Sequence, residues 1–122
     1  MNLRELNPGD KVPEEFKVVI EIPKGSSNKY EIGDNGEITL DRVLYGANFY
    51  PHNYGFIPRT KYLDGDPVDV VVLTTYPVAP GCVIKCRPIG VLKMRDEAGE
   101  DNKIIAVPVA KIDPRFSDIQ DI

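Results

Sequence analysis

The chain has 122 residues and a mass of 13.6 kDa, which is the size of one domain and argues against a second independent one. Hydrophobic residues make up 42% and charged residues 28%, so neither intrinsic disorder nor a fibrous repeat describes the chain. A formal net charge of −4 argues weakly against a general nucleic-acid binder, which is usually basic.

Short β-type segments begin at residue 16. In residues 16–22 the apolar side chains alternate, which places Phe16, Val18, Ile20 and Ile22 on one face of a strand. Residues 29–32 and 37–44 flank Gly33-Asp34-Asn35-Gly36, a sequence typical of a turn between two strands.

The second half of the chain continues in the same way. Residues 68–73 read as a buried strand, and residues 103–109 as the last strand. Between them, residues 82–93 form a strand that Pro88 interrupts, which predicts a sheet edge or a bulge at that point. Five or six short strands with Gly/Pro turns predict a mainly β domain over residues 1–122, built as a small antiparallel barrel or sandwich.

The C-terminal residues have a different pattern. Phe116, Ile119 and Ile122 recur at a spacing of three, and Ser117 is a suitable N-cap, so a helix is expected to start here.

The cysteine content and the absence of targeting patterns bear on the compartment. Cys82 and Cys86 are too few for a disulfide framework, and we expect both to be reduced in or near the β core. The sequence has no run of roughly 18 apolar residues and no apolar signal segment at its start, which predicts a cytoplasmic location.

The most informative segment is Asp64-Gly65-Asp66-Pro67-Val68-Asp69. Three carboxylates in six residues repel one another unless a positive group lies among them, and Gly65 and Pro67 favour the bend that would bring them together. Hard oxygen donors of this kind suit Mg²⁺, Mn²⁺ or Ca²⁺. The alternative is a solvated acidic turn, because Asp-Gly and Asp-Pro are common in turns.

A second acidic segment, residues 96–101, lies between two predicted strands. If residues 97–100 form a hairpin loop, Asp96 and Asp101 face each other across it. Alone, this segment is a solvated hairpin tip. Together with the first segment it could complete a two-metal site, which binds substrate oxyanions and activates water.

Cationic and phenolic side chains for an anionic substrate also occur. Lys29 and Glu31 share one strand face, Arg42 is suited to bidentate phosphate binding, and Lys103 shares a face with Asp101. Residues 50–55 read as a turn that presents two tyrosines. Each group taken singly is also compatible with an ordinary surface residue.

Several motifs in chain order resemble the soluble family I inorganic pyrophosphatases of bacterial type. The motifs are Val19-Ile20-Glu21-Ile22-Pro23, Lys29-Tyr30-Glu31, Leu40-Asp41-Arg42, Phe49-Tyr50-Pro51-His52-Asn53-Tyr54-Gly55, Asp64-Gly65-Asp66-Pro67-Val68-Asp69-Val70 and Lys93-Met94-Arg95-Asp96-Glu97-Ala98-Gly99-Glu100-Asp101-Asn102-Lys103. The resemblance implies Mg²⁺-dependent hydrolysis of diphosphate to two orthophosphates, with several Mg²⁺ ions and Mn²⁺ as a substitute.

The resemblance also implies a set of metal ligands and a base. Asp64, Asp69 and Asp101 would hold a first metal, with Asp69 bridging to a second, and Asp96 with Asp101 would hold metal carried with the substrate. Glu21 would act through water. Asp66 would be the general base for a metal-bridged water.

The remaining roles implied by the resemblance are substrate binding and support. The substrate-binding residues would be Lys29, Arg42, Tyr54 and Lys103. The supporting residues would be Glu31, Tyr50 and Glu97.

The resemblance further implies a highly twisted five-stranded OB-type barrel, a homohexamer, and a C-terminal helical segment beyond residue 122 that carries a Tyr-Lys pair of the site. We therefore expect this chain to lack the C-terminal part of the family domain, which would impair activity.

The alternative function is a non-enzymatic OB-type module that binds nucleic acid or divalent cations. In the nucleic-acid version Phe49, Tyr50, Tyr54 and Phe56 would stack on bases.

Overall fold

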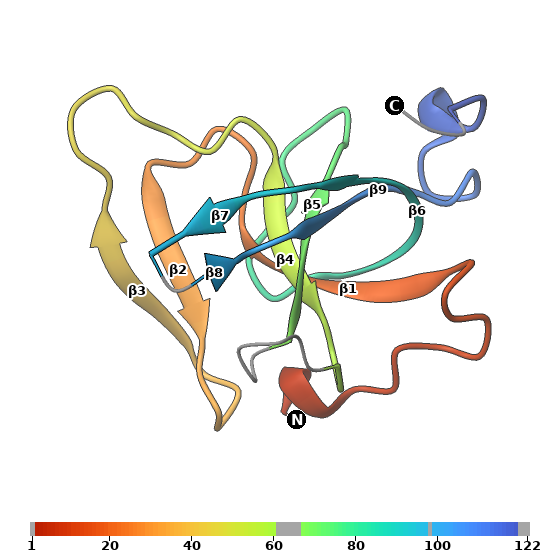
Figure 1. Cartoon of the computed structure of the whole chain (residues 1–122), viewed down its shortest axis with the longest axis horizontal. Coiled ribbons are helices and arrows are strands. Elements are labelled where there is room, and N and C mark those ends of the chain that lie inside the picture. The colour runs from red at the N-terminus through yellow and green to blue at the C-terminus, as the bar shows by residue number, and fades with distance from the viewer. Residues whose placement is uncertain (1, 61–66, 98, 120–122) are drawn as a thin grey trace.

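A computed structural model describes residues 2–60, 67–97 and 99–119, with the side chain of Asp96 left out. Nine strands and two short 3-10 helices make up its regular structure (Figure 1). In chain order they are η1 (Leu3–Glu5), β1 (Phe16–Ile22), β2 (Asn28–Ile32), β3 (Ile38–Val43), β4 (Asn53–Ile57), β5 (Val68–Val72), β6 (Val83–Leu92), β7 (Arg95–Asp96), β8 (Gly99–Glu100), β9 (Lys103–Pro108) and η2 (Pro114–Phe116). No helix in the described ranges has the length and apolarity that crossing a membrane requires.

Five strands close into a barrel in the order β1-β4-β5-β9-β6, which confirms the predicted mainly β, five-stranded barrel. The β2–β3 and β7–β8 pairs are separate hairpins. Neighbouring barrel strands run antiparallel except β5 and β9, which are parallel. The prediction of a purely antiparallel sheet is therefore wrong at this one junction, where a crossover separates the two strands in sequence.

The alternation of apolar residues in β1 creates two packed layers. Phe16, Val18 and Ile20 point into the barrel core, where they pack with residues of β4, β5, β6 and β9. Val19 on the opposite face is also fully buried, because Ile32 at the end of β2 covers it. The β2–β3 hairpin is therefore attached to the outside of the barrel over β1 and β4.

Three register shifts interrupt the strand pairs. In β1 the shift falls at Glu21, between Ile20 and Ile22, and in the β2–β3 hairpin it falls at Asp41. The third lies between Pro88 and Gly90, which confirms the predicted irregularity at Pro88. Bulges redirect side chains and are frequent beside functional sites.

The structure differs from expectation in two other segments. Residues 53–57 form barrel strand β4 and not the end of a turn. Ser117 ends η2, whose N-cap is Asp113, and does not begin a helix. Residues 120–122 lie outside the described residues.

The cysteines are both free, but only one belongs to the core. Cys86 is fully buried in β6, and burial raises the pKa of its thiol to about 12. Cys82 lies just before β6 and is exposed, contrary to the expectation that it is in or near the core.

Candidate active site

The candidate site lies on the outer face of the barrel, between β4, β5 and β9 and the attached β2–β3 hairpin. A pocket of about 430 Å³ next to these strands is lined mainly by residues of β1, β2, β4 and β5. The predicted site residues that line it are Glu21, Lys29, Glu31, Tyr54 and Asp69. Residues from four separate sequence motifs therefore share one cavity.

Strand pairing explains how the central residues meet. Tyr54 pairs with Val71, which places Tyr54 on the same face of the β4–β5 ladder as Asp69, two residues from Val71. Val70 pairs with Ile104 in the parallel β5–β9 ladder, so Lys103 lies beside Asp69. The pairing brings a phenol, a carboxylate and an ammonium together from three adjacent strands.

Lys103 is the centre of this group. Its Nζ donates hydrogen bonds to the Tyr54 hydroxyl at 2.8 Å, to Asp101 Oδ2 at 3.1 Å and to Asp69 Oδ2 at 3.3 Å. The Lys103 side chain is only 12% exposed, whereas those of Asp69 and Asp101 are 30% and 29% exposed. The predicted common face of Asp101 and Lys103 is confirmed by this contact.

The environment fixes the charges of Lys103 and Tyr54. Burial alone would lower the pKa of Lys103, but the Tyr54 hydroxyl and the Asp69 and Asp101 carboxylates outweigh burial and raise this pKa above its usual value. Burial, with the Asp69 charge nearby, raises the pKa of Tyr54. At neutral pH the site therefore holds an ammonium and a neutral phenol, both of which can donate to phosphate oxygens.

Glu21 enters the pocket from the bulge in β1. Its Oε2 accepts a hydrogen bond from the Ile32 backbone N–H at 3.0 Å. Burial, and then the negative charges of Asp69 and Glu31, raise the pKa of Glu21, while the Ile32 N–H and Arg4 act in the opposite direction. Carboxylates crowded in this way favour a bound cation.

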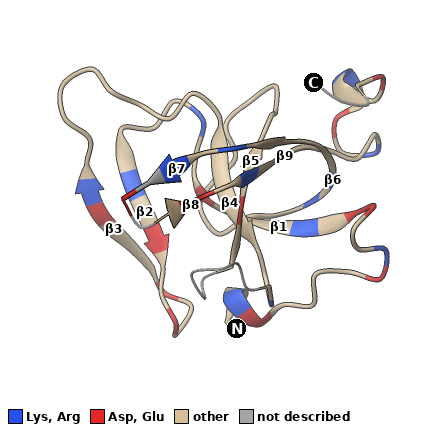
Figure 2. Ribbon diagram, viewed as in Figure 1, with Lys and Arg blue, Asp and Glu red and all other residues tan. Residues whose placement is uncertain are grey.

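The β2–β3 hairpin supplies the basic groups, and Figure 2 shows basic and acidic residues on both of its strands. Lys29 and Arg42 are cross-strand partners. Asp41 in the bulge contacts both, at 3.6 Å from Lys29 Nζ and 3.3 Å from Arg42 Nε. Lys29 lines the pocket, whereas Arg42 does not line it and has a side chain 67% exposed.

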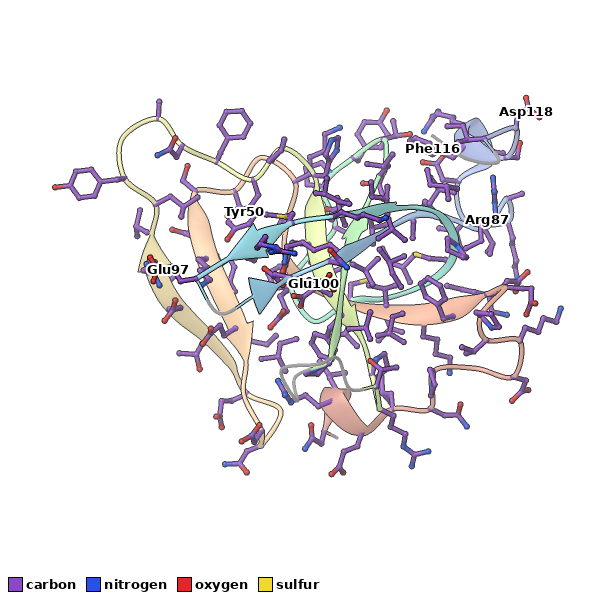
Figure 3. All side chains as sticks on the ribbon, viewed as in Figure 1. Tyr50, Arg87, Glu97, Glu100, Phe116 and Asp118 are labelled. Carbon is purple, nitrogen blue, oxygen red and sulfur yellow. The ribbon has the colours of Figure 1, made fainter. Side chains whose placement is uncertain are left out.

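The supporting residues are divided between the site and the surface. The Tyr50 ring packs against the Tyr54 ring, with centroids 5.9 Å apart. Glu97 is exposed on the β7–β8 hairpin and is not among the pocket residues (Figure 3).

The expected pairing of Asp96 with Asp101 is wrong. Asp96 pairs with Gly99, so the β7–β8 turn is tighter than the predicted four-residue loop. The Asp101 N–H donates instead to the Met94 carbonyl oxygen at 3.0 Å. Asp64 and Asp66 lie outside the described residues.

The donor set matches a hard divalent cation. Glu21, Asp69 and Asp101 contribute only carboxylate oxygens, which Mg²⁺ and Mn²⁺ prefer. Within residues 2–60, 67–97 and 99–119, no three acidic, His or Cys side chains converge closely enough to hold an ion by themselves. The side chains of the predicted ligands Asp64 and Asp96 are not among those described.

Sequence reasoning missed Arg4 and Asp34, which also line the pocket. Asp34 lies in the predicted turn at residues 33–36, which gave no sign of a site, and only the folding of residues 2–6 onto the barrel brings Arg4 to the pocket. In the part of the chain described, Phe56 is 2% exposed, so it is not available for stacking on a base.

Comparisons with known proteins bear on the family of the chain. The family model described as inorganic pyrophosphatase matches residues 18–122. An inorganic pyrophosphatase of Aquifex pyrophilus is 57% identical over 123 residues, covering 100% of this chain and 70% of that protein. One from Vibrio parahaemolyticus is 51% identical over 124 residues, with the same coverage.

Solved structures show the same fold. The crystal structure of inorganic pyrophosphatase from Thermus thermophilus superposes with a TM-score of 0.95 and 54% sequence identity, covering 100% of this chain and 70% of that one. The match of family model, sequence and barrel confirms the resemblance found in the motifs. The chain belongs to the inorganic pyrophosphatase family.

Proposed function

We propose that the chain hydrolyses inorganic diphosphate to two orthophosphates in a Mg²⁺-dependent reaction. The observation that carries this proposal is the convergence of Tyr54, Asp69 and Asp101 on the Lys103 ammonium, beside a pocket that Glu21 and Lys29 also line. Such an arrangement suits a small, highly charged anion better than a macromolecule. The names of the relatives support the same substrate.

The carboxylates would hold the metal. Glu21, Asp69 and Asp101, together with Asp64 and Asp96, would bind several Mg²⁺ ions, and Mn²⁺ would substitute because it prefers the same oxygen donors. Bound Mg²⁺ would supply positive charge to the diphosphate oxygens and make the attacking water more acidic. Without that charge, the carboxylates and the anionic substrate would repel each other.

The basic and phenolic groups would orient the substrate. Lys103 and Tyr54, which contact each other on the barrel, would donate from one side, and the cross-strand partners Lys29 and Arg42 would donate from the hairpin. Lys103 keeps its proton, because its pKa is raised, and so it stabilises charge and does not act as a base. Phosphoryl transfer depends mainly on such positioning and charge stabilisation.

The proton of the attacking water would pass to Asp66. Oxygen of the water forms a bond to one phosphorus, the bridging P–O bond breaks, and the second orthophosphate leaves. No covalent enzyme intermediate is required, which agrees with the absence of a Ser-His-acid arrangement in the sequence.

Three further properties are part of the proposal. They are a homohexamer, a cytoplasmic location, and one domain over residues 1–122 that corresponds to part of the family domain.

The role of Asp66 is tested with Asp66→Asn. We expect this variant to lose about 10²- to 10⁴-fold in kcat while it still binds Mn²⁺ in a calorimetric titration. Asp118→Asn is the matched control, because Asp118 is exposed at the C-terminal side of the molecule (Figure 3) and should leave kcat unchanged. Wild-type turnover in Asp66→Asn would remove Asp66 as the base.

Salt-dependent binding of single-stranded DNA by a chain without Mn²⁺ affinity would instead support the nucleic-acid alternative.

A further inference from the structure

The N-terminal segment is packed against the candidate site. Leu3 and Leu6 contact the small core cluster of Val19, Ile32 and Phe56, which lies beneath the β2–β3 hairpin. The Asn2 side chain donates to the Asp34 carbonyl oxygen at 2.6 Å. Residues 2–6 therefore pack beside the turn of the β2–β3 hairpin and the end of β4 (Figure 1).

Arg4 makes the most contacts in this segment. Its Nη1 donates to the Ile32 carbonyl oxygen at 3.1 Å, and its Nε lies 3.6 Å from Asp34 Oδ1. The guanidinium carbon is 5.8 Å from the centre of the Phe56 ring in barrel strand β4. The Arg4 carbonyl oxygen accepts from the Arg59 N–H at 3.0 Å, which ties η1 to the segment after β4.

Ile32 is consequently held from two sides. Its carbonyl oxygen accepts from Arg4, and its N–H donates to Glu21 Oε2 at 3.0 Å. Glu31 directly precedes Ile32, and Lys29 lies on the same strand, so the two contacts fix the strand that carries these site residues. The barrel residue Glu21 and the N-terminal residue Arg4 thus bind the two backbone polar groups of one residue, Ile32.

We propose that Arg4 is a positioning residue of this site: it anchors the end of β2 so that Lys29 and Glu31 face Glu21 and Asp69. This inference rests on the proposed diphosphate hydrolysis. Arg4 precedes residues 18–122, the range that the family model matches.

The geometry favours arginine for this role. A planar guanidinium can donate to the Ile32 carbonyl oxygen, pair with Asp34 and stack near Phe56 at the same time. A lysine ammonium keeps the charge but presents a single nitrogen, so it can replace only part of this set. Arg4→Lys should therefore give an intermediate effect.

Hydrogen exchange and steady-state kinetics test the proposal. In Arg4→Ala we expect the Ile32 amide to exchange at least about tenfold faster, while the amides of β5 keep their wild-type rates. We expect the KM for diphosphate with Mg²⁺ to rise about tenfold, the effect of losing one well-oriented charged contact by Lys29. Arg4→Lys should lie between wild type and Arg4→Ala in both measurements.

Arg115→Ala is the matched control. Arg115 also pairs with a carboxylate, Asp113 at 3.8 Å, and its guanidinium carbon is 5.7 Å from the Tyr76 ring centre, but it belongs to η2. This variant should change neither Ile32 exchange nor KM.

Three results would overturn the proposal. The first is an Arg4→Ala variant with wild-type Ile32 exchange and KM. The second is a raised KM without faster Ile32 exchange, which would mean that Arg4 touches the substrate itself. The third is an equal increase in the exchange rates of the Ile32 amide and the β5 amides, which would mean that the substitution destabilises the whole fold. If the wild-type chain does not hydrolyse diphosphate, the proposed function fails, and Ile32 exchange alone then decides whether Arg4 anchors β2.

Discussion

Lys103 is the residue on which the candidate site depends most. A nearly buried ammonium is costly unless it is paired, and Lys103 has Tyr54, Asp69 and Asp101 as its partners. The sequence motifs were sufficient to select these four residues. The hydrogen bonds of Lys103 to Tyr54 and Asp69 could not be predicted, because they depend on the parallel pairing of β5 and β9, which β6, β7 and β8 separate in sequence.

Replacing Lys103 by Met tests the role of this charge. Lys103→Met keeps most of the side-chain volume and removes the charge that faces the substrate, so we expect kcat/KM for diphosphate to fall about 10²-fold or more. Stability should change by only about 1 kcal/mol in urea unfolding, because Asp69 and Asp101 are partly solvated. Lys111→Met is the control for an exposed lysine. Activity within twofold of wild type in Lys103→Met would remove Lys103 from the site.

Glu21 gives a pH-dependent prediction. Burial and its acidic neighbours raise its pKa above the ordinary 4.5, so the folded chain holds this proton more tightly than the unfolded chain. The free energy of unfolding therefore decreases as the pH rises from the ordinary pKa of Glu21 through its raised pKa in the folded chain. Glu21→Gln removes this loss of stability, because glutamine carries no charge at any pH.

In metal-free buffer with EDTA, Glu21→Gln should melt at a higher temperature than wild type at pH 7, and the difference should shrink as the pH falls below the ordinary pKa of Glu21. Glu14→Gln, which changes an exposed carboxylate, should show no such dependence. A Glu21→Gln variant that is less stable than wild type at every pH would contradict the burial argument. With Mg²⁺ present, its activity should be lower than that of wild type.

At the scale of elements, the strand pattern was predictable and the bulges only in part. Alternating residues identified β1, and Pro88 correctly marked an irregularity in β6. The bulge at Glu21 has no such marker, because it arises from the register between β1 and β4. The prediction of a turn over residues 50–55 is wrong for β4. The segment is short, contains Gly55 and lacks an alternating pattern, and its buried Asn53 is a residue type that is common in loops.

Gly55 is required for the close approach of β1 and β4. A Cβ at residue 55 would lie 2.2 Å from the Val19 carbonyl oxygen, which is backbone and cannot move aside. We expect Gly55→Ala to lower the free energy of unfolding by at least about 2 kcal/mol in urea denaturation.

Gly33→Ala is the control for this substitution. There the nearest atom is the Oε1 end of the Glu37 side chain at 2.6 Å, which can rotate away, so the cost should be below about 1 kcal/mol. Equal losses in the two variants would show that the β1–β4 contact is not the cause.

At the scale of the whole molecule, the barrel and the hairpin have separate tasks. The barrel supplies Tyr54, Asp69 and Lys103 from adjacent strands, and the β2–β3 hairpin supplies Lys29 above them. The motifs predicted the family and the five-stranded barrel. They could not predict that residues 2–6 fold back beneath the hairpin, because those contacts are made largely by backbone atoms of the hairpin and leave no sequence pattern.

We propose that this assembly hydrolyses diphosphate with Mg²⁺. The most direct test is orthophosphate release by the wild-type chain from diphosphate, measured with Mg²⁺ and again with EDTA, while circular dichroism confirms that the chain is folded in both. We predict two orthophosphates for each diphosphate consumed with Mg²⁺, and a rate that falls to the uncatalysed level with EDTA. No release above the uncatalysed rate from the folded chain with Mg²⁺, or an unchanged rate in EDTA, would contradict the claim.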